Sequence, residues 1–176
     1  MYKPKFVLLI TLFAALAATA AAQRATPVAA AKSFYAYDRA HSQTFNRRNV
    51  NARKTWFSDE LYSLFRNELR REDAYLKKNS TNKPYFGDGG FGFRPLDENC
   101  GTGGKRPGRR LTIKPAFQKG NRAAVTAIFA FPKPCKDPDT TTYTIGLIKG
   151  KGGWLIDDVN YGDVRTLKDD LKRKEY

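Results

Sequence analysis

Two pairs of strand-like segments, each joined by a short glycine-containing turn, fill the last third of the chain and restrict it to folds with an antiparallel sheet. Residues 110–117 and 122–132 flank the turn QKGN, and residues 140–149 and 153–161 flank the turn GKG. Turns of two to five residues that contain glycine are typical of β-hairpins. Apolar and polar residues alternate within each segment, as in strands with one buried face. The pattern therefore predicts four antiparallel strands.

Two helices are predicted before these strands. Residues 26–43 carry apolar side chains at helical spacing, and residues 58–79 do so over a longer stretch. Ser58 can cap the second helix, and two acidic residues follow it where the helix dipole favours negative charge. The basic, Asn-rich segment between the helices, residues 46–56, is expected to be a connection.

A short helix is predicted over residues 163–176, where Asp163 can cap the first turn. The chain then consists of helices, an irregular segment, four antiparallel strands and a terminal helix. Helices gathered on one face of an antiparallel sheet form a two-layer α+β domain. We therefore predict one α+β domain over residues 23–176, with two to three helices packed on a four-stranded antiparallel sheet and a short C-terminal helix.

The first residues have the pattern of a secretory signal peptide. Lys3 and Lys5 precede an apolar run from Phe6 to Ala18, and small residues follow it. A retained membrane anchor is the alternative, but a spanning helix needs roughly 20 strongly apolar residues, and the second half of this run is mostly alanine. We expect residues 1–22 to be cleaved and the mature chain to be periplasmic or secreted, not an integral membrane protein.

The chain contains two cysteines, Cys100 and Cys135. An exported protein meets oxidising conditions, and one pair of cysteines allows a single connectivity. A disulfide between them would close a loop of about 35 residues and stabilise the fold by roughly 3–4 kcal/mol. Two free buried thiols are the alternative. Two cysteines and the lone His41 fall short of a four-ligand zinc site, and we predict no metal and no cofactor.

The chain is strongly basic, with 32 Lys and Arg against 17 Asp and Glu, a net charge of +15. Such a charge attracts anions. Export removes nucleic acid as the usual partner, which leaves anionic components of the cell envelope or an acidic protein. Alternatively, the charge only keeps an exported protein soluble. A candidate anion patch comprises Lys105, Arg106, Arg109 and Arg110. It lacks the spacing of a phosphate-binding loop. The alternative interpretation is a solvated loop with no bound anion.

Residues 83–110 form an excursion rich in glycine and proline between the helices and the strands. Long irregular segments inside compact domains are usually functional or mobile. Its aromatic side chains can either cover the core or line the mouth of a ligand site, and covering is the preferred interpretation. These aromatic residues are Tyr85, Phe86, Phe91 and Phe93.

Two adjacent carboxylates, Asp157 and Asp158, lie in the apolar run of the last strand. Successive side chains of a regular strand point to opposite faces, so Trp154 and Asp158 would face one way and Asp157 and Val159 the other. The carboxylates then cannot converge on one substrate unless a bulge intervenes. We interpret them as a strand end, or as one carboxylate entering a pocket. The candidate residues here are Asp157, Asp158 and Tyr161.

Signals for catalysis are weak elsewhere in the sequence. General acid–base chemistry needs two groups with separated pKa values that converge on one substrate, and the only histidine, His41, lies near the predicted end of a helix. The chain has no G-x-S-x-G motif for a nucleophilic serine. We therefore predict no catalytic residue.

The order of these elements resembles the nuclear-transport-factor-like, cystatin-like α+β fold, and more narrowly the exported bacterial proteins grouped as domain of unknown function 3828. The resemblance implies a curved, cone-like sheet and an extracytoplasmic location. Relatives of the broad fold include isomerases and dehydratases as well as binding modules. The matching segments are FYAYD, FSDELYSLFRNEL, YFGDGGFGF, AAVTAIFAF and GGWLIDDVNYGDVRTLKDDL.

We expect an exported, non-catalytic binding or interaction module. One alternative is a small pocket enzyme of the isomerase or hydratase type, which a closed cavity holding an inward Asp beside a Tyr or His would favour. Another is an inhibitor or immunity-type protein whose basic face meets an acidic partner. A concave sheet face filled by the chain's own side chains would favour a partner-binding surface.

Overall fold

The computed structural model describes residues 24–79, 84–86, 90–95, 108–133, 140–162 and 165–173. The remaining residues include several that carry sequence predictions, which therefore lie outside the described residues. These are the signal peptide of residues 1–22, both cysteines of the predicted disulfide (Cys100 and Cys135), Lys105 and Arg106 of the anion patch, and Asp163.

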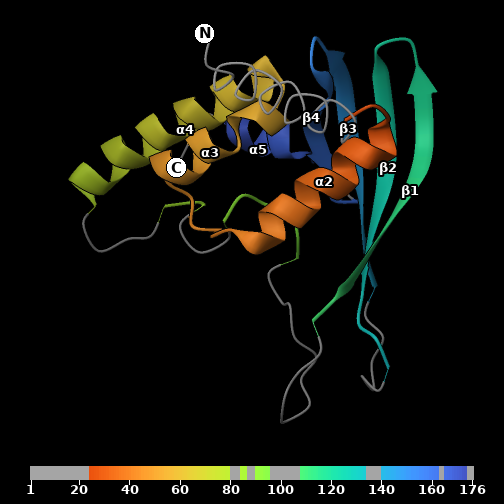
Figure 1. Cartoon of the computed structure of the whole chain (residues 1–176). Coiled ribbons are helices and arrows are strands. Elements are labelled where there is room, and N and C mark those ends of the chain that lie inside the picture. The colour runs from red at the N-terminus through yellow and green to blue at the C-terminus, as the bar shows by residue number, and fades with distance from the viewer. Residues whose placement is uncertain are drawn as a thin grey trace, which may run out of the picture.

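Four strands form one antiparallel sheet in the order β1-β2-β3-β4, and the helices gather on one side of it, as Figure 1 shows. This confirms the predicted α+β class with a curved four-stranded sheet. The strands are β1 Arg110–Lys119, β2 Arg122–Ala130, β3 Thr140–Gly150 and β4 Gly153–Asn160.

The helical elements agree with two of the three predicted helices nearly to the residue. Thr26 caps the first helix through its hydroxyl, which accepts a hydrogen bond from the Ala29 amide at 3.1 Å. Ser58 caps the long helix in the same way, accepting from the Leu61 amide at 3.1 Å. The elements are α2 Pro27–Ala40, α3 Arg47–Ala52, the 3₁₀ helix η1 Lys54–Trp56, α4 Asp59–Lys78 and α5 Leu167–Lys172.

The prediction that residues 46–56 are only a connection was wrong, because they form α3 and η1. The Asn46 side chain accepts a hydrogen bond from the Asn49 amide at 2.9 Å and starts α3. The last helix also begins later than expected, since Thr166 and Asp169 form a reciprocal capping box at its first turn.

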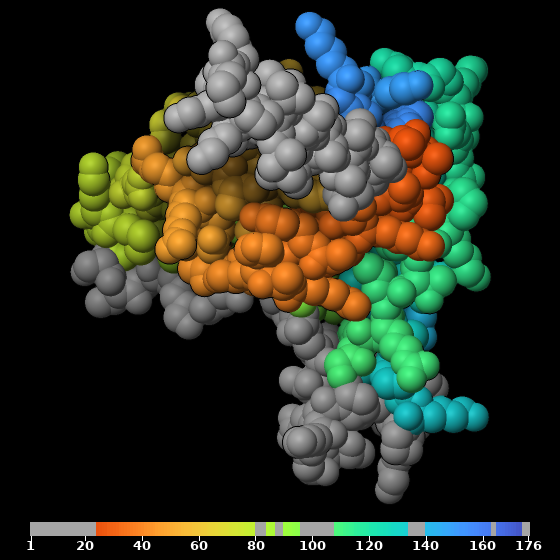
Figure 2. Space-filling view, in the orientation of Figure 1, coloured from red at the N-terminus to blue at the C-terminus, as the bar shows by residue number. Residues whose placement is uncertain are grey.

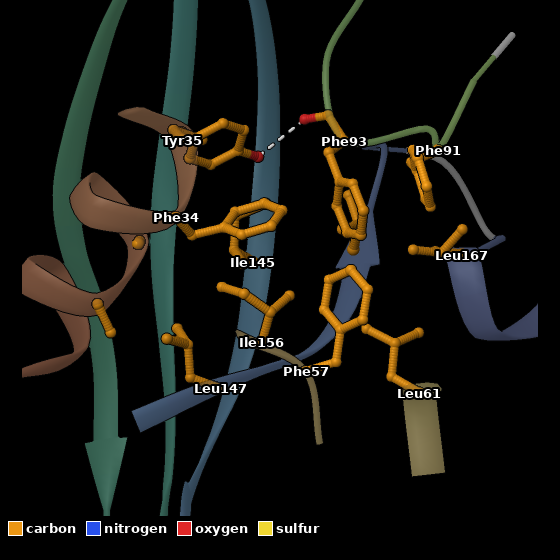
Figure 3. Packing of buried hydrophobic residues seen from close by; sticks show 14 of the residues in the cluster. Phe34, Tyr35, Phe57, Leu61, Phe91, Phe93, Ile145, Leu147, Ile156 and Leu167 are labelled. Atoms are coloured by element: carbon orange, nitrogen blue, oxygen red, sulfur yellow. Dashed lines mark hydrogen bonds between the residues drawn. The ribbon is translucent and has the colours of Figure 1, made fainter. Parts of the chain in front are cut away.

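The core lies between the sheet and the helices and is dominated by phenylalanine. Phe34 of α2, Phe57 and Phe65 meet Phe91 and Phe93 of the excursion, and all five are buried. Figure 3 shows Phe34 and Phe57 next to Ile145 and Ile156 of the sheet, with Phe93 stacked near Phe57. Each fully buried ring contributes roughly 1.5–3 kcal/mol. The face of the sheet that the helices cover is therefore filled by the protein's own side chains.

The excursion divides between core and surface. Phe86, Phe91 and Phe93 are buried, as predicted for a covering segment, whereas Tyr85 remains 49% exposed. The hydroxyl of Tyr35 donates to the Phe93 carbonyl at 2.8 Å, which fixes the excursion against α2 (Figure 3). The position of residues 90–95 is thus set by packing from both sides, and these residues carry part of the candidate site.

Within the ranges that the structure describes, no helix combines the length and the apolar character that crossing a bilayer requires.

Candidate binding site

The two adjacent aspartates lie at a bulge in β4. Asp158 is opposite Gly146 of β3 while Ile156 is opposite Leu147, so Asp157 is an extra residue in the strand. The bulge that the sequence analysis named as the exception is therefore present, and the regular alternation ends at this point. Val159 is buried on the same face as Trp154 and Ile156, not on the opposite one.

Both carboxylates contact one residue, Lys168 of α5. An oxygen of Asp158 accepts hydrogen bonds from the Val159 amide at 2.8 Å and from the Lys168 amide at 2.9 Å. The Asp157 carboxylate pairs with the Lys168 ammonium group at 2.9 Å, and Glu60 of α4 pairs with the same group at 2.7 Å. Partial burial opposes the charged form of this lysine, but the hydrogen bonds that its ammonium group donates to Glu60 and Asp157 raise its pKa. The pair therefore attaches α5 to the end of β4.

Tyr161, which follows β4, lines an aromatic pocket of about 260 Å³. Its ring meets the edge of the Tyr143 ring with the centroids 5.2 Å apart. Asp170 of α5 and Arg94 add charge to the walls. We call this the aromatic pocket; its lining residues are Tyr85, Phe86, Gly90, Gly92, Arg94, Tyr143, Tyr161 and Asp170.

Glycine is required where the excursion passes Tyr161. Gly92 has φ +72°, which disfavours a side chain, and a Cβ there would lie 2.6 Å from the Tyr161 hydroxyl oxygen. The absence of a side chain at this residue thus lets the tyrosine reach the pocket wall.

The tyrosine hydroxyls of this pocket act as hydrogen-bond donors. Burial, and then the nearby charge of Asp170, raise the pKa of Tyr161. Burial also raises the pKa of Tyr85, and so do the charge of Asp170 and its hydrogen bond with the Tyr85 side chain. Both phenols therefore stay protonated near neutral pH, while the carboxylate of Asp170, also 4.0 Å from Arg165, acts as an acceptor.

A second pocket, of about 250 Å³, adjoins the first through Arg94, which lines both. Three arginines reach it from three segments of the chain: Arg39 in the last turn of α2, Arg94 in the excursion and Arg109 just before β1. We call it the arginine pocket. Its other lining residues are Pro95, Gly108 and Phe129.

A buried ionic network stands behind the two pockets. Asp38 of α2 is fully buried and pairs with Arg53 at 2.9 Å and with Arg94 at 3.0 Å. Gln43 also donates to it at 2.8 Å. Arg53 is itself fully buried and lies over the Phe91 ring, 4.4 Å from its centroid. Moving Arg94 away would leave the buried charge of Asp38 less well compensated, which is costly. The network therefore holds Arg94 in place.

Of the predicted anion patch, the structure describes Arg109 and Arg110 alone. Arg109 is buried, donates to the Phe129 carbonyl at 3.4 Å and to the Thr141 hydroxyl at 3.3 Å, and lies over the Phe131 ring. Arg110 is exposed at the start of β1. Arg109 and Arg110 are adjacent in sequence, but the first is buried and the second is exposed.

His41 lies at the end of α2, where its ring stacks on Tyr37 with centroids 3.9 Å apart and hydrogen-bonds the Tyr37 carbonyl. Within the described ranges, no group of three or more His, Cys, Asp or Glu residues is arranged to hold a metal ion.

Sequence reasoning missed Arg39, Arg94, Tyr143 and Asp170. They come from four distant segments, and only the position of Arg94 directly after the buried Phe91 and Phe93 offered a local signal. Comparisons with protein-family models, with curated proteins and with solved structures found no match. The family resemblance therefore stays a prediction, and any function has to be argued from the geometry.

Proposed function

We propose that this chain is an exported, non-catalytic binding or interaction module whose ligand enters the aromatic pocket. One observation carries the proposal: phenylalanines fill the space between sheet and helices, where enzymes of cone-like folds would place a substrate, and the aromatic pocket lies at its rim. A filled interior favours recognition at the surface over chemistry in a cavity.

The walls of the aromatic pocket suit a ligand with a flat apolar face and a polar edge. Tyr85, Tyr143 and Tyr161 supply rings for stacking, and the Tyr161 hydroxyl supplies a donor, whereas that of Tyr85 already donates to Asp170. Asp170 adds an acceptor and Arg94 adds a cation. A sugar ring or a small aromatic ring, free or carried by a partner, combines these properties.

Saturation-transfer difference NMR against monosaccharides and small aromatic acids tests this proposal. We expect saturable binding that Tyr85→Ala weakens at least about tenfold, because the variant removes one wall of the pocket without opening the core. Phe117→Ala is the matched control, since Phe117 is another exposed aromatic residue, 56% exposed against 49% for Tyr85. Equal binding by the two variants would show that the aromatic pocket is not the site.

A small pocket enzyme is the second candidate, because Asp170 lines the same pocket as Tyr85 and Tyr161, as a base beside proton donors. The same NMR experiment in D₂O separates the candidates. An isomerase would exchange a carbon-bound hydrogen of its ligand for deuterium, and a hydratase would consume alkene signals. Asp170→Asn would abolish either change. Binding with no change in the ligand supports the binding module.

A further inference from the structure

Three arginines from separate parts of the chain line the arginine pocket. Arg39 belongs to α2, Arg94 to the excursion and Arg109 to the segment entering β1. Cations repel one another, so gathering three around a space of about 250 Å³ costs electrostatic energy that a bound anion would offset. That space equals about eight times the roughly 30 Å³ that one water molecule takes up in the liquid. The pocket is thus large enough for a small ion or group.

The three arginines are held in position before any ligand arrives. Arg94 is fixed by the buried Asp38 at 3.0 Å, and Arg109 by the Phe129 carbonyl and the Thr141 hydroxyl. Arg39 donates to the Arg109 carbonyl at 3.0 Å, which joins the last turn of α2 to the start of β1. Arginines already ordered lose little conformational entropy when they bind.

Among the described residues, four arginines, Arg39, Arg53, Arg94 and Arg109, accompany one aspartate, Asp38, which corresponds to a formal charge of +3 for these five residues. Partial desolvation, and then the charge of Arg94, lower the pKa of Arg39. A bound anion would relieve the repulsion that Arg39 experiences.

We propose that the arginine pocket binds a phosphate- or sulfate-type oxyanion. Guanidinium groups present planar forks of N–H donors that match the paired oxygens of such anions. A doubly charged tetrahedral ion offers more acceptor oxygens and more charge than a single carboxylate, and this suits a pocket lined by three arginines. This inference rests on its own residues and stands whether or not the aromatic pocket takes a ring.

Isothermal titration calorimetry with inorganic phosphate and with sulfate, at an ionic strength held constant with NaCl, tests the proposal. We expect saturable one-site binding to the purified chain. Arg39→Gln should weaken it at least about tenfold, because one charge-assisted contact is lost. Lys32→Gln is the matched control, since Lys32 is also an exposed cation of α2 and its removal changes the net charge equally. It should change the affinity less than about twofold.

Several outcomes would overturn the proposal. They are absence of saturable binding, equal weakening by the two variants, or binding of acetate as tight as that of phosphate. Circular dichroism checks that Arg39→Gln is folded. Tyr85→Ala should leave phosphate affinity unchanged, so failure of the ring site and failure of the anion site are distinguishable.

Two sources of such a group remain to be separated, a soluble phosphate ester and a lipid headgroup. Glucose 6-phosphate and vesicles containing phosphatidic acid carry the same phosphate monoester chemistry. Vesicle binding that inorganic phosphate displaces and Arg39→Gln abolishes assigns the lipid, whereas binding of the sugar phosphate alone assigns a soluble ligand. Vesicle binding that Lys32→Gln weakens as much as Arg39→Gln reflects net charge and contradicts the site.

Discussion

At the scale of single residues, one inserted aspartate changes the burial pattern of the last strand. Asp157 is the extra residue of the bulge, and it reverses which side chains face the core after it. The sequence pattern predicted the strand but not the bulge. The buried residues Trp154, Ile156 and Val159 depart from strict alternation by a single residue, which is too small a signal to identify a bulge. The carboxylates that suggested chemistry instead join β4 to α5.

Asp158→Ala should destabilise the protein by about 1–3 kcal/mol, because the amides of Val159 and Lys168 lose their shared acceptor. The free energy of unfolding in urea measures this change. Asp73→Ala is the control, since Asp73 is exposed and its pair with Arg47, at 3.6 Å, should contribute less than about 1 kcal/mol. Equal effects of the two substitutions would contradict the role assigned to Asp158.

At the scale of elements, the strands, the long helices and the short terminal helix were predictable, whereas the short helix α3 and the contacts of the excursion were not. In β2, alternate residues from Ala123 to Phe129 are buried, as the sequence pattern indicated. The six-residue helix α3 has too few turns to display a periodic stripe, and a capping asparagine marks it only weakly. The excursion carried the right residue types for a cover, but its contacts with Phe34, Phe57 and Phe65 are all distant in sequence.

The second half of α4 carries a buried acid that should make stability depend on pH. Burial raises the pKa of Glu72 to about 7, against the 4.5 of an ordinary glutamate; its hydrogen bond from the Phe86 amide opposes the rise, and the charge of Glu68 adds to it. The folded chain therefore binds this proton more tightly than the unfolded chain. Its contribution to stability is complete below pH 4.5 and is lost as the pH rises through 7.

We expect Glu72→Gln to remove a decline in unfolding free energy of about 2–3 kcal/mol between these pH values. The side-chain amide oxygen of the glutamine variant can still accept the hydrogen bond from the Phe86 backbone amide, so the packing is retained. Urea midpoints from pH 4 to 8 for both proteins provide the measurement. Glu60→Gln should act in the opposite sense, because hydrogen bonds from Lys168 and Lys172 lower the pKa of Glu60 to about 2. An unchanged slope in Glu72→Gln would refute the assignment.

At the scale of the whole molecule, the class of fold followed from the order of helices and hairpins, whereas the pockets did not. Arg39, Arg94 and Arg109 come together only after α2, the excursion and β1 have packed. A charge of +15 indicated attraction for anions without locating it. The sequence therefore shows how many basic residues the chain has. It does not show which of them come together from distant segments to form a site.

Cys100 and Cys135 remain predicted to form a disulfide, which would link the excursion to the segment between β2 and β3. Intact-mass spectrometry without reductant should show a chain lighter by two hydrogens than the reduced one. Reduction should lower the free energy of unfolding by roughly 3–4 kcal/mol. An unchanged mass on reduction would mean that the cysteines are free.

The burial of Phe91 and Phe93 also bears on how the chain can change over evolution. Residues 90–95 are fixed to the core by these rings and by the bond from Tyr35 to the Phe93 carbonyl. They therefore give the long insertion a fixed point within its length. Adding residues to a flexible connection costs little loop-closure entropy, so the insertion can gain or lose residues on either side of this point without displacing it. Related chains would then vary in length on both sides of an invariant aromatic anchor.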